Sequence, residues 1–200
     1  RLNAKKKNVV VVGGGDTAMD CVRTAVRQGA KNVKCLYRRN RENMPGSMRE
    51  VLHAEEEGVE FKWLSVPINI FGNKQVDAIE VAKVKLGEPD ASGRESPKIL
   101  AKDTFKLKAD MVIKAIGFHP EPLPKLFNHP SLQVTKWGTI KIDHETMMTN
   151  QPGIFAAGDI VRGAALVVWA IRDGRDAAKS IDNYLSKNIN KEETKQFASL

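Results

Sequence analysis

The stretch VVVVGGGDTAMD, residues 9–20, contains a run of valines that ends on three glycines and an aspartate. A continuous run of β-branched residues is typical of a strand buried on both faces, and the apolar residues after the glycines return at helical spacing. The stretch therefore predicts a strand, a tight turn and a helix. Gly13, Gly15 and Ala18 match G-x-G-x-x-G/A, in which the glycines admit a pyrophosphate to the backbone at a helix N-terminus. The alternative is a glycine turn with only a structural role.

A cluster of arginines follows the next predicted strand, Val33 to Tyr37. At this distance from the glycines, the dinucleotide fold places either an acid that binds the ribose of NAD or an arginine that accepts the 2′-phosphate of NADP. Arg38 and Arg39 stand here in place of the acid. A guanidinium matches the oxygens of a phosphate, so the pair favours NADPH over a solvated basic turn.

The segments up to Gly117 predict an α/β unit. Ser47 and Glu50 have the spacing of a capping box at the start of a helix that ends by Gly58, and Val59 to Ser65 indicates a third strand. Residues 75–116 alternate or run apolar on both sides of a polar turn segment, residues 87–98. They predict an antiparallel meander and a return to a core strand, Asp110 to Ile116. Gly117 and the proline-rich FHPEPLP mark a boundary.

The third informative segment begins at NQPGIFAAGD, residues 150–159. It predicts a short apolar strand that ends at Gly158 and Asp159, followed by a long helix from about Ala164. An aspartate between a strand and a helix N-terminus is able to bond a polyol hydroxyl, and a simple capping aspartate is the alternative. We expect residues 8–116 to form one domain, residues 117–187 to form part of another, and residues 188–200 to form a polar tail.

Composition and charge narrow the class of protein. The 200 residues are 42% hydrophobic and 28% charged with a net charge of +8, and no apolar run is long enough to cross a bilayer. We therefore expect a cytoplasmic protein without membrane or nucleic-acid partners, because the lysines are dispersed and no nucleic-acid-binding motif occurs. Cys21 and Cys35 lack C-x-x-C spacing and are interpreted as buried small hydrophobes, and the histidines lack ligand spacing, so no metal site is predicted.

Four segments together resemble one family of flavoproteins. They are GGGDTAMDCVRTAVRQGA, YRRNRENMPGSMREV, ADMVIKAIGFHP and PGIFAAGDIVRGAALVVWAIRDGRDAA. In this order they resemble the NADPH and flavin portion of glutamate synthase small (beta) subunits. They are similar also to dihydropyrimidine dehydrogenase and to related electron-bifurcating and sulfide dehydrogenase subunits. The resemblance implies a Rossmann-like three-layer FAD/NAD(P)-binding fold of the thioredoxin-reductase-like pyridine nucleotide-disulphide oxidoreductase type, with a parallel sheet, an antiparallel β-meander and the C-terminal part of a FAD domain.

The resemblance also assigns cofactor-binding residues, with the NADPH pyrophosphate at the first glycine turn, its 2′-phosphate at the arginine pair, and FAD at the ribitol-binding aspartate and the backbone after it. The residues are Gly13, Gly14, Gly15, Asp16, Thr17, Ala18, Arg38, Arg39, Gly117, Gly158, Asp159, Val167 and Val168. It implies hydride transfer from NADPH to FAD, without a catalytic side chain, because the cofactors carry the chemistry. Electrons would continue through iron–sulfur clusters to a glutamate synthase large subunit.

The family pattern extends beyond these residues. It includes a second G-x-G-x-x-G for the ADP half of FAD and a cysteine-rich iron–sulfur region, and neither motif occurs in the 200 residues. The resemblance therefore implies that the missing FAD and iron–sulfur regions belong to the same polypeptide. The lack of C-x-x-C argues against thioredoxin reductase itself. Two hypotheses remain open: an NADPH-dependent oxidoreductase subunit, most simply of the glutamate synthase type, and a nucleotide-binding module without turnover.

Overall fold

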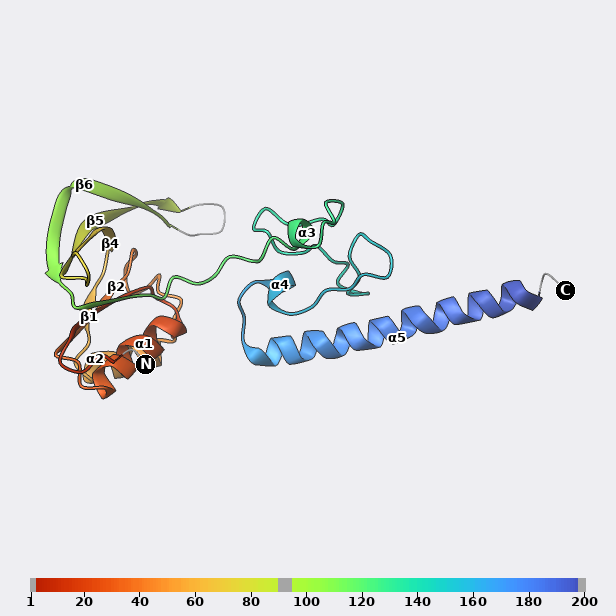
Figure 1. The fold of residues 1–200 in the computed structure, drawn as a ribbon, viewed down its shortest axis with the longest axis horizontal. Coiled ribbons are helices and arrows are strands. Elements are labelled where there is room, and N and C mark those ends of the chain that lie inside the picture. The colour runs from red at the N-terminus through yellow and green to blue at the C-terminus, as the bar shows by residue number, and fades with distance from the viewer. Residues whose placement is uncertain (1–2, 90–94, 198–200) are drawn as a thin grey trace. The chain divides into compact units, whose positions relative to one another are not determined.

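The computed structural model describes residues 3–89 and 95–197, with side chains up to residue 187. Its contacts divide the chain into two compact units, residues 1–117 and residues 118–200. Figure 1 shows the sheets in the first unit and a long helix, α5 (Val167–Phe197), in the second.

The first unit is built on a four-stranded parallel sheet in the order β3-β2-β1-β7. Its strands are β1 (Asn8–Val12), β2 (Asn32–Leu36), β3 (Glu60–Lys62) and β7 (Met111–Lys114). The helices α1 (Asp16–Arg27) and α2 (Met48–Glu56) connect the first three strands. An antiparallel sheet in the order β4-β5-β6 forms the other layer, from β4 (Ser65–Phe71), β5 (Ala78–Pro89) and β6 (Glu95–Lys108). The predicted α/β class, with a parallel sheet and an antiparallel meander, is confirmed.

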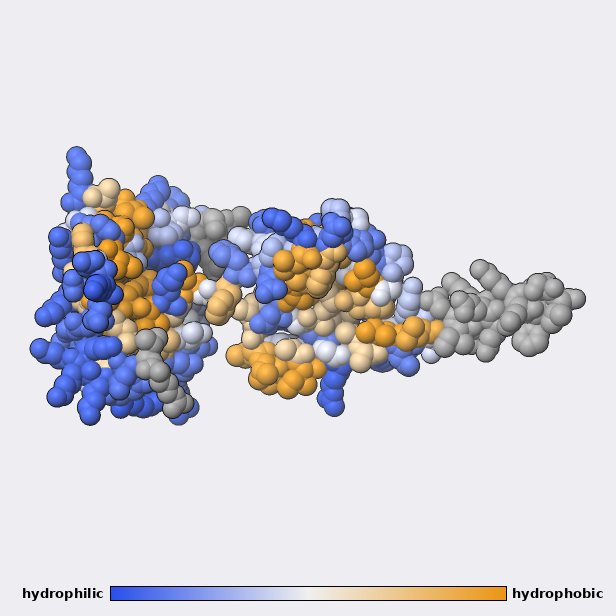
Figure 2. Space-filling view, viewed as in Figure 1, coloured by the Kyte–Doolittle hydropathy of each residue, from blue (hydrophilic) through white to orange (hydrophobic). Residues whose placement is uncertain are grey.

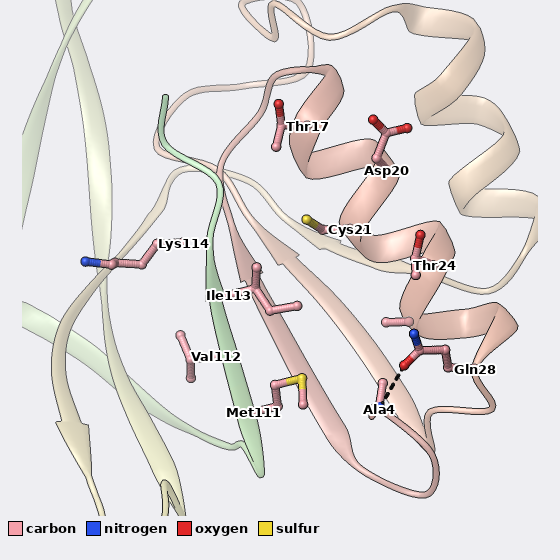
Figure 3. A pocket seen from close by; sticks show the side chains of 11 residues that line it. Ala4, Thr17, Asp20, Cys21, Thr24, Gln28, Met111, Val112, Ile113 and Lys114 are labelled. Atoms are coloured by element: carbon pink, nitrogen blue, oxygen red, sulfur yellow. Dashed lines mark hydrogen bonds between the residues drawn. The ribbon is translucent and has the colours of Figure 1, made fainter. Parts of the chain in front are cut away.

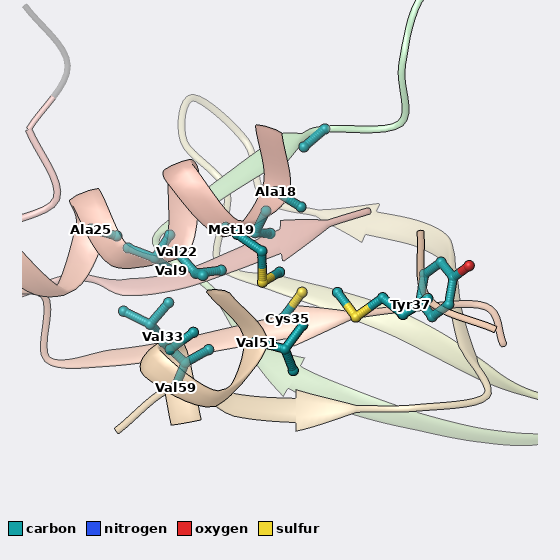
Figure 4. Packing of buried hydrophobic residues seen from close by; sticks show 14 of the residues in the cluster. Val9, Ala18, Met19, Val22, Ala25, Val33, Cys35, Tyr37, Val51 and Val59 are labelled. Carbon is teal, nitrogen blue, oxygen red and sulfur yellow. The ribbon is translucent and has the colours of Figure 1, made fainter. Parts of the chain in front are cut away.

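The valine run is buried on both faces because it lies between these layers. Successive side chains of a strand point to opposite faces. Val9 and Val11 pack with the helices, in a cluster that includes Met19 and Val51 (Figure 4). Val10 packs on the opposite face against residues of the antiparallel sheet such as Ile79. One continuous apolar segment thereby contributes to two cores.

The second unit contains little sheet. It has α3 (Leu123–Leu126), α4 (Asp159–Arg162) and α5 (Val167–Phe197), with isolated bridges among the loops between α3 and α4. Apolar side chains gather at the exposed start of α5 (Figure 2). The helix continues through residues 188–197, which were expected to form a polar tail, and residues 198–200 lie outside the described part of the chain.

The third strand was predicted correctly, but its end and the capping box were not. Ser65 does not end the third strand but begins β4 in the other sheet, because Leu64 takes a φ of 50° and turns the chain. Ser47 is the N-cap of α2, but its side chain makes no capping hydrogen bond. Glu50, its expected capping partner, instead forms an ion pair with Arg23 of α1.

The second-unit elements and the hairpin turn also differ from expectation. Before Gly158 only Phe155 bridges to another residue, so no strand forms there. The long helix begins at Val167 rather than Ala164, because Gly163, with a φ of 82°, ends α4 and separates the two helices. Strands β5 and β6 extend into the predicted polar turn, whose residues 90–94 lie outside the described part of the chain.

Candidate functional site

The glycine turn lies where β1 passes into α1, and its shape excludes larger residues. Gly13 has a φ of +150°, and a Cβ atom there would lie 2.1 Å from the carbonyl oxygen of Ala115. A Cβ atom on Gly14 would lie 2.4 Å from the ring of Tyr37. The backbone is therefore packed against the residues that follow β7 and β2, whereas a Cβ atom on Gly15 would meet nothing within 4 Å. The outer side of the turn is open at Gly15.

The turn also presents unpaired backbone donors. Gly13 donates its N–H to Leu36, and the first helical bonds run from Ala18 and Met19 to the Gly15 carbonyl. Within the described residues, no acceptor receives the N–H groups between them, those of Gly14, Gly15, Asp16 and Thr17. Free N–H groups at the positive end of a helix dipole form a site suited to an anion.

The Asp16 carboxylate is bound to a neighbouring loop. Its Oδ1 atom accepts the backbone N–H of Ser47 at 2.9 Å, and Gly46 donates to the Gly14 carbonyl at 2.9 Å. These two bonds hold the segment before α2 against the glycine turn. The side chain of Asp16 therefore positions a loop, and only its backbone N–H is suited to an anion.

Close packing behind the turn fixes its position. Ala18 is fully buried, as the small residue of the motif requires for a helix that approaches its strand closely. Cys35 on β2 belongs to the buried cluster drawn in Figure 4, and its Sγ atom lies 3.4 Å from the Gly13 carbonyl oxygen. Burial raises the pKa of the Cys35 thiol to about 12, so this thiol stays protonated at neutral pH. Cys21 is only half-buried, so the expectation of burial is correct for Cys35 alone.

The arginine pair emerges at the same edge of the sheet as the glycine turn. Val12 and Leu36 are register partners at the ends of the parallel strands β1 and β2, and Arg38 and Arg39 follow two and three residues after Leu36. Arg38 is exposed, and no acceptor within the described part of the chain pairs with it. Arg39 is half-buried, and its Nε atom donates to the backbone carbonyl of Glu95 at 3.0 Å.

Two residues around the arginines were not predicted from the sequence. Asn43 donates its side-chain amide to Glu95 Oε2 at 2.9 Å, and Glu95 lies at the start of β6. The hydroxyl of Tyr37 donates to the Asn43 carbonyl at 2.8 Å, which fixes the loop after β2. No sequence motif marks Glu95, because it lies 56 residues from Arg39.

Gly117 is the last predicted cofactor-binding residue in the first unit. Lys114, the last residue of β7, is the register partner of Val12 on β1, so the chain leaves the sheet at the edge where the glycine turn lies. Gly117 has a φ of +83°, which L side chains rarely adopt, and a Cβ atom there would meet nothing within 4 Å. Its glycine is required by backbone conformation rather than by crowding.

The second unit carries the remaining candidates. Gly158, with φ 74° and ψ −150°, precedes Asp159, whose side chain is exposed at the first position of α4. Val167 and Val168 are 72% and 59% exposed at the start of α5. The structure therefore brings these candidates to two adjacent helix starts within one unit.

An ion pair between an exposed arginine and a buried aspartate joins those two helices. Arg162 of α4 donates Nε and Nη2 to the two carboxylate oxygens of Asp173 of α5, at 2.9 and 2.5 Å. Asp173 is only 5% exposed, and Arg162 also lies over the Trp169 ring, 5.1 Å from its centroid. The hydrogen bonds from Arg162, assisted by the Gly158 backbone, hold the pKa of Asp173 below its usual range.

Other features of the described residues carry less chemistry. A groove of about 550 Å³ runs between α1 and β7 and is mostly apolar (Figure 3). Thr17 is the candidate residue among those that line it. No group of three or more metal-ligating side chains is found in residues 3–89 and 95–187. No helix in the described part of the chain has the length and apolarity to cross a membrane.

A glycine turn at a helix N-terminus, beside an arginine pair at the carboxyl edge of a parallel sheet, defines a dinucleotide-binding α/β protein. Residues 1–174 match the family model described as pyridine nucleotide-disulphide oxidoreductase. The chain belongs to this family.

Particular relatives refine the comparison. The chain is 62% identical over 183 residues to the glutamate synthase [NADPH] small chain of Azospirillum brasilense, and this match covers 92% of the chain and 38% of that protein. It is 51% identical over 189 residues to the glutamate synthase [NADPH] small chain of Escherichia coli (strain K12), and this second match covers 92% of the chain and 40% of that protein. The chain thus spans about two fifths of the length of these relatives.

Among solved structures, Mycobacterium tuberculosis FprA in complex with NADPH matches with a TM-score of 0.74 at 17% identity. That match covers 98% of this chain and 58% of the FprA chain. At this identity the likeness establishes the fold. Together with the family match, it confirms the predicted Rossmann-like FAD/NAD(P)-binding fold.

Proposed function

We propose that the first unit binds NADPH and that the longer protein to which it belongs transfers hydride from NADPH to FAD. The observation that carries this proposal is the meeting of two features at one sheet edge. These are the unpaired N–H groups of the glycine turn and the arginine pair after β2. Each feature alone has a structural explanation, but together they match the two phosphate groups on the adenosine ribose of NADPH, the pyrophosphate at its 5′ position and the phosphate at its 2′ position.

The pyrophosphate would accept hydrogen bonds from the backbone of the glycine turn. The open side of Gly15 lets it approach the helix start, and the α1 dipole favours its negative charge. Arg39 donates its Nε–H to the backbone carbonyl of Glu95, and neither terminal nitrogen of its guanidinium has an acceptor within the described residues. Arg38 is exposed beside it, so both side chains are available to a 2′-phosphate.

The second unit would hold part of FAD. Asp159 offers an exposed carboxylate that is able to accept hydrogen bonds from ribitol hydroxyls, and Val167 and Val168 offer backbone and apolar surface at the start of α5. These residues fit the flavin end of the cofactor, which supplies the hydride acceptor when it is bound. Stacking and exclusion of water, rather than a side-chain acid or base, would promote the transfer, so no catalytic residue is assigned.

The relatives support a finer proposal. We propose that the whole protein is a glutamate synthase small subunit, whose electrons pass through iron–sulfur clusters of its remaining regions to a large subunit that makes glutamate. The identity of 62% to a protein of that name supports this assignment. The related sulfide, ferredoxin and pyrimidine dehydrogenase subunits are alternatives with a different final acceptor. We also propose a cytoplasmic location, in line with two cysteines that form no disulfide.

A nucleotide-binding module without turnover is the second candidate for the 200-residue chain. The exposed apolar start of α5 favours it, because Val167 and Val168 have no cover within the described residues. A flavin site with one solvated wall would hold its ligand weakly.

Calorimetric titration with NADPH and with NADH tests the proposal, after a visible spectrum has been recorded for bound flavin. Preferential binding of NADPH is the expected result. A flavin spectrum would favour the oxidoreductase, and its absence would favour the module as the behaviour of this chain alone. Failure to bind either nucleotide would contradict the proposal and make the glycine turn structural.

A further inference from the structure

The start of β6 contacts the loop that follows β2 and carries Arg38 and Arg39, which we call the arginine loop, at two points. The backbone carbonyl of Glu95 accepts the Nε–H of Arg39 at 3.0 Å, and the carboxylate of Glu95 accepts the side-chain amide of Asn43 at 2.9 Å. Asn43 is itself held by Asn40, whose Oδ1 atom accepts the Asn43 amide at 2.7 Å. A residue of the antiparallel sheet is therefore fixed on the loop that carries Arg38 and Arg39.

The two contacts of Glu95 would have opposite effects on a phosphate bound by the arginines. The carbonyl contact fixes the orientation of the Arg39 guanidinium without using its terminal nitrogens. None of the ion pairs in the described part of the chain joins the Glu95 carboxylate to Arg39, so that guanidinium does not neutralise its charge directly. It is held beside the loop by a neutral amide, where it repels any anion that the arginines bind.

We infer that Glu95 is a specificity-determining residue of the proposed NADPH site, in which its carbonyl orients Arg39 and its carboxylate limits the preference for the 2′-phosphate. This inference rests on the proposed function. NADPH and NADH differ only at the 2′-phosphate, so the carboxylate penalises NADPH and leaves NADH nearly unaffected. The antiparallel sheet thereby contributes to nucleotide selection as well as to the core.

The substitution Glu95→Gln separates the two contacts. The new side chain keeps a carbonyl oxygen for the Asn43 amide and leaves the backbone carbonyl in place, while the negative charge is lost. We expect NADPH to bind about three- to fivefold more tightly, with NADH changed by less than about twofold. The gain for NADPH is expected to shrink between about 50 mM and about 300 mM KCl, because salt screens charges that solvent reaches.

Glu88→Gln is the matched control. Glu88 is exposed near the end of β5 in the same hairpin. Its substitution changes the net charge by the same amount as Glu95→Gln but removes no contact to the arginine loop. Titration of both variants with 2′,5′-ADP and 5′-AMP, in addition to the dinucleotides, places any effect at the adenosine end. Far-UV circular dichroism checks that each variant is folded.

The outcomes distinguish this inference from the function on which it rests. Tighter binding of NADPH and 2′,5′-ADP in Glu95→Gln alone would support it. Unchanged or weaker NADPH binding in that variant, or equal gains in Glu88→Gln, would overturn it while leaving the NADPH site intact. If the wild-type chain binds neither dinucleotide, the proposed function fails first and the role of Glu95 fails with it.

Discussion

At the residue scale, Gly13 and Gly15 of the turn are glycines for different physical reasons. Gly13 is fixed by its conformation and by the carbonyl of Ala115, whereas Gly15 has open space where a side chain would project. The first is a requirement of the fold, and the second leaves room for a ligand. Substitutions at the two positions should therefore have separable effects.

Gly13→Ala should destabilise the first unit by about 2–4 kcal/mol, because the new Cβ would lie 2.1 Å from the Ala115 oxygen at a strained φ. Gly15 has a φ of −91°, and a Cβ atom there would have no close neighbour. Gly15→Ala should therefore lower the free energy of unfolding by less than about 1 kcal/mol. It should still weaken NADPH binding about tenfold or more, because the Cβ obstructs the approach of the pyrophosphate.

Urea unfolding and calorimetry of the two variants measure these effects side by side. A Gly15→Ala variant that binds NADPH as tightly as the wild type would contradict the placement of the pyrophosphate. A Gly13→Ala variant of unchanged stability would contradict the packing of the turn against Ala115.

At the element scale, the ion pair between α4 and α5 makes the second unit sensitive to acid. The pKa of Asp173 is lower in the folded chain than its ordinary value of 3.8, chiefly through the hydrogen bonds from Arg162. A carboxyl group of this kind stabilises the fold fully above its unfolded pKa, and the contribution is lost as the pH falls through the lower, folded value.

We therefore expect the thermal midpoint of the second unit to be steady from neutral pH to about pH 4 and to fall below it. Asp173→Asn should lower the midpoint at neutral pH and flatten its dependence on acid. Asp176→Asn is the matched control, because Asp176 is exposed and lies 3.6 Å from Arg172 of its own helix. Near-UV circular dichroism follows the transition through the aromatic side chains, of which Trp137 and Trp169 belong to the second unit, and equal profiles for both variants would argue against the ion pair.

Local patterns predicted the elements whose signals are contained in neighbouring residues. The valine run, the glycines and the helical spacing of Ala18 and Val22 specified β1, the turn and α1, because each signal lies within a few residues. The end of the third strand was mispredicted, because Leu64 gives no sequence sign of its positive φ. The capping box failed because Arg23 of another helix competes for Glu50.

Contacts between distant segments were the part of the candidate site that the sequence did not reveal. Arg38 and Arg39 were predicted from their interval after the glycines. Because β1 and β2 are parallel neighbours, that interval places the arginines and the glycine turn at the same edge of the sheet. Glu95 reaches the same loop from the antiparallel sheet, and its contact depends on the register of β5 with β6. A pattern within one segment holds no information on such a register.

At the scale of the whole molecule, the chain consists of two compact units, and both hydrophobic core clusters found in the described residues lie in the first of them. The segment after Gly117 has no regular structure up to α3, and Phe118 is 92% exposed. The glycine turn and the arginine pair both belong to the first unit, so nucleotide binding should depend on that unit alone.

Chymotrypsin should cut the native chain first after Phe118, because proteases favour exposed irregular backbone. The product that ends at Phe118 should resist further cleavage and should retain NADPH binding. Mass spectrometry of a digestion time course identifies the site, and Phe118→Ser should delay this first cut. An early cut after Tyr37 or Phe61, which pack in the core of the first unit, would contradict a compact first unit.

The double substitution of Arg38 and Arg39 by alanine tests the central claim most directly, through calorimetric titration with NADPH and NADH. The account predicts about a 100-fold loss of NADPH affinity, since two charge-assisted contacts to the 2′-phosphate are removed, and a change of less than about threefold for NADH. Alanine at Arg172 and Arg175, exposed on α5, controls for the loss of two positive charges. Equal losses for NADPH and NADH in the Arg38 and Arg39 variant would contradict the account, because arginines that read the 2′-phosphate cannot affect both nucleotides alike.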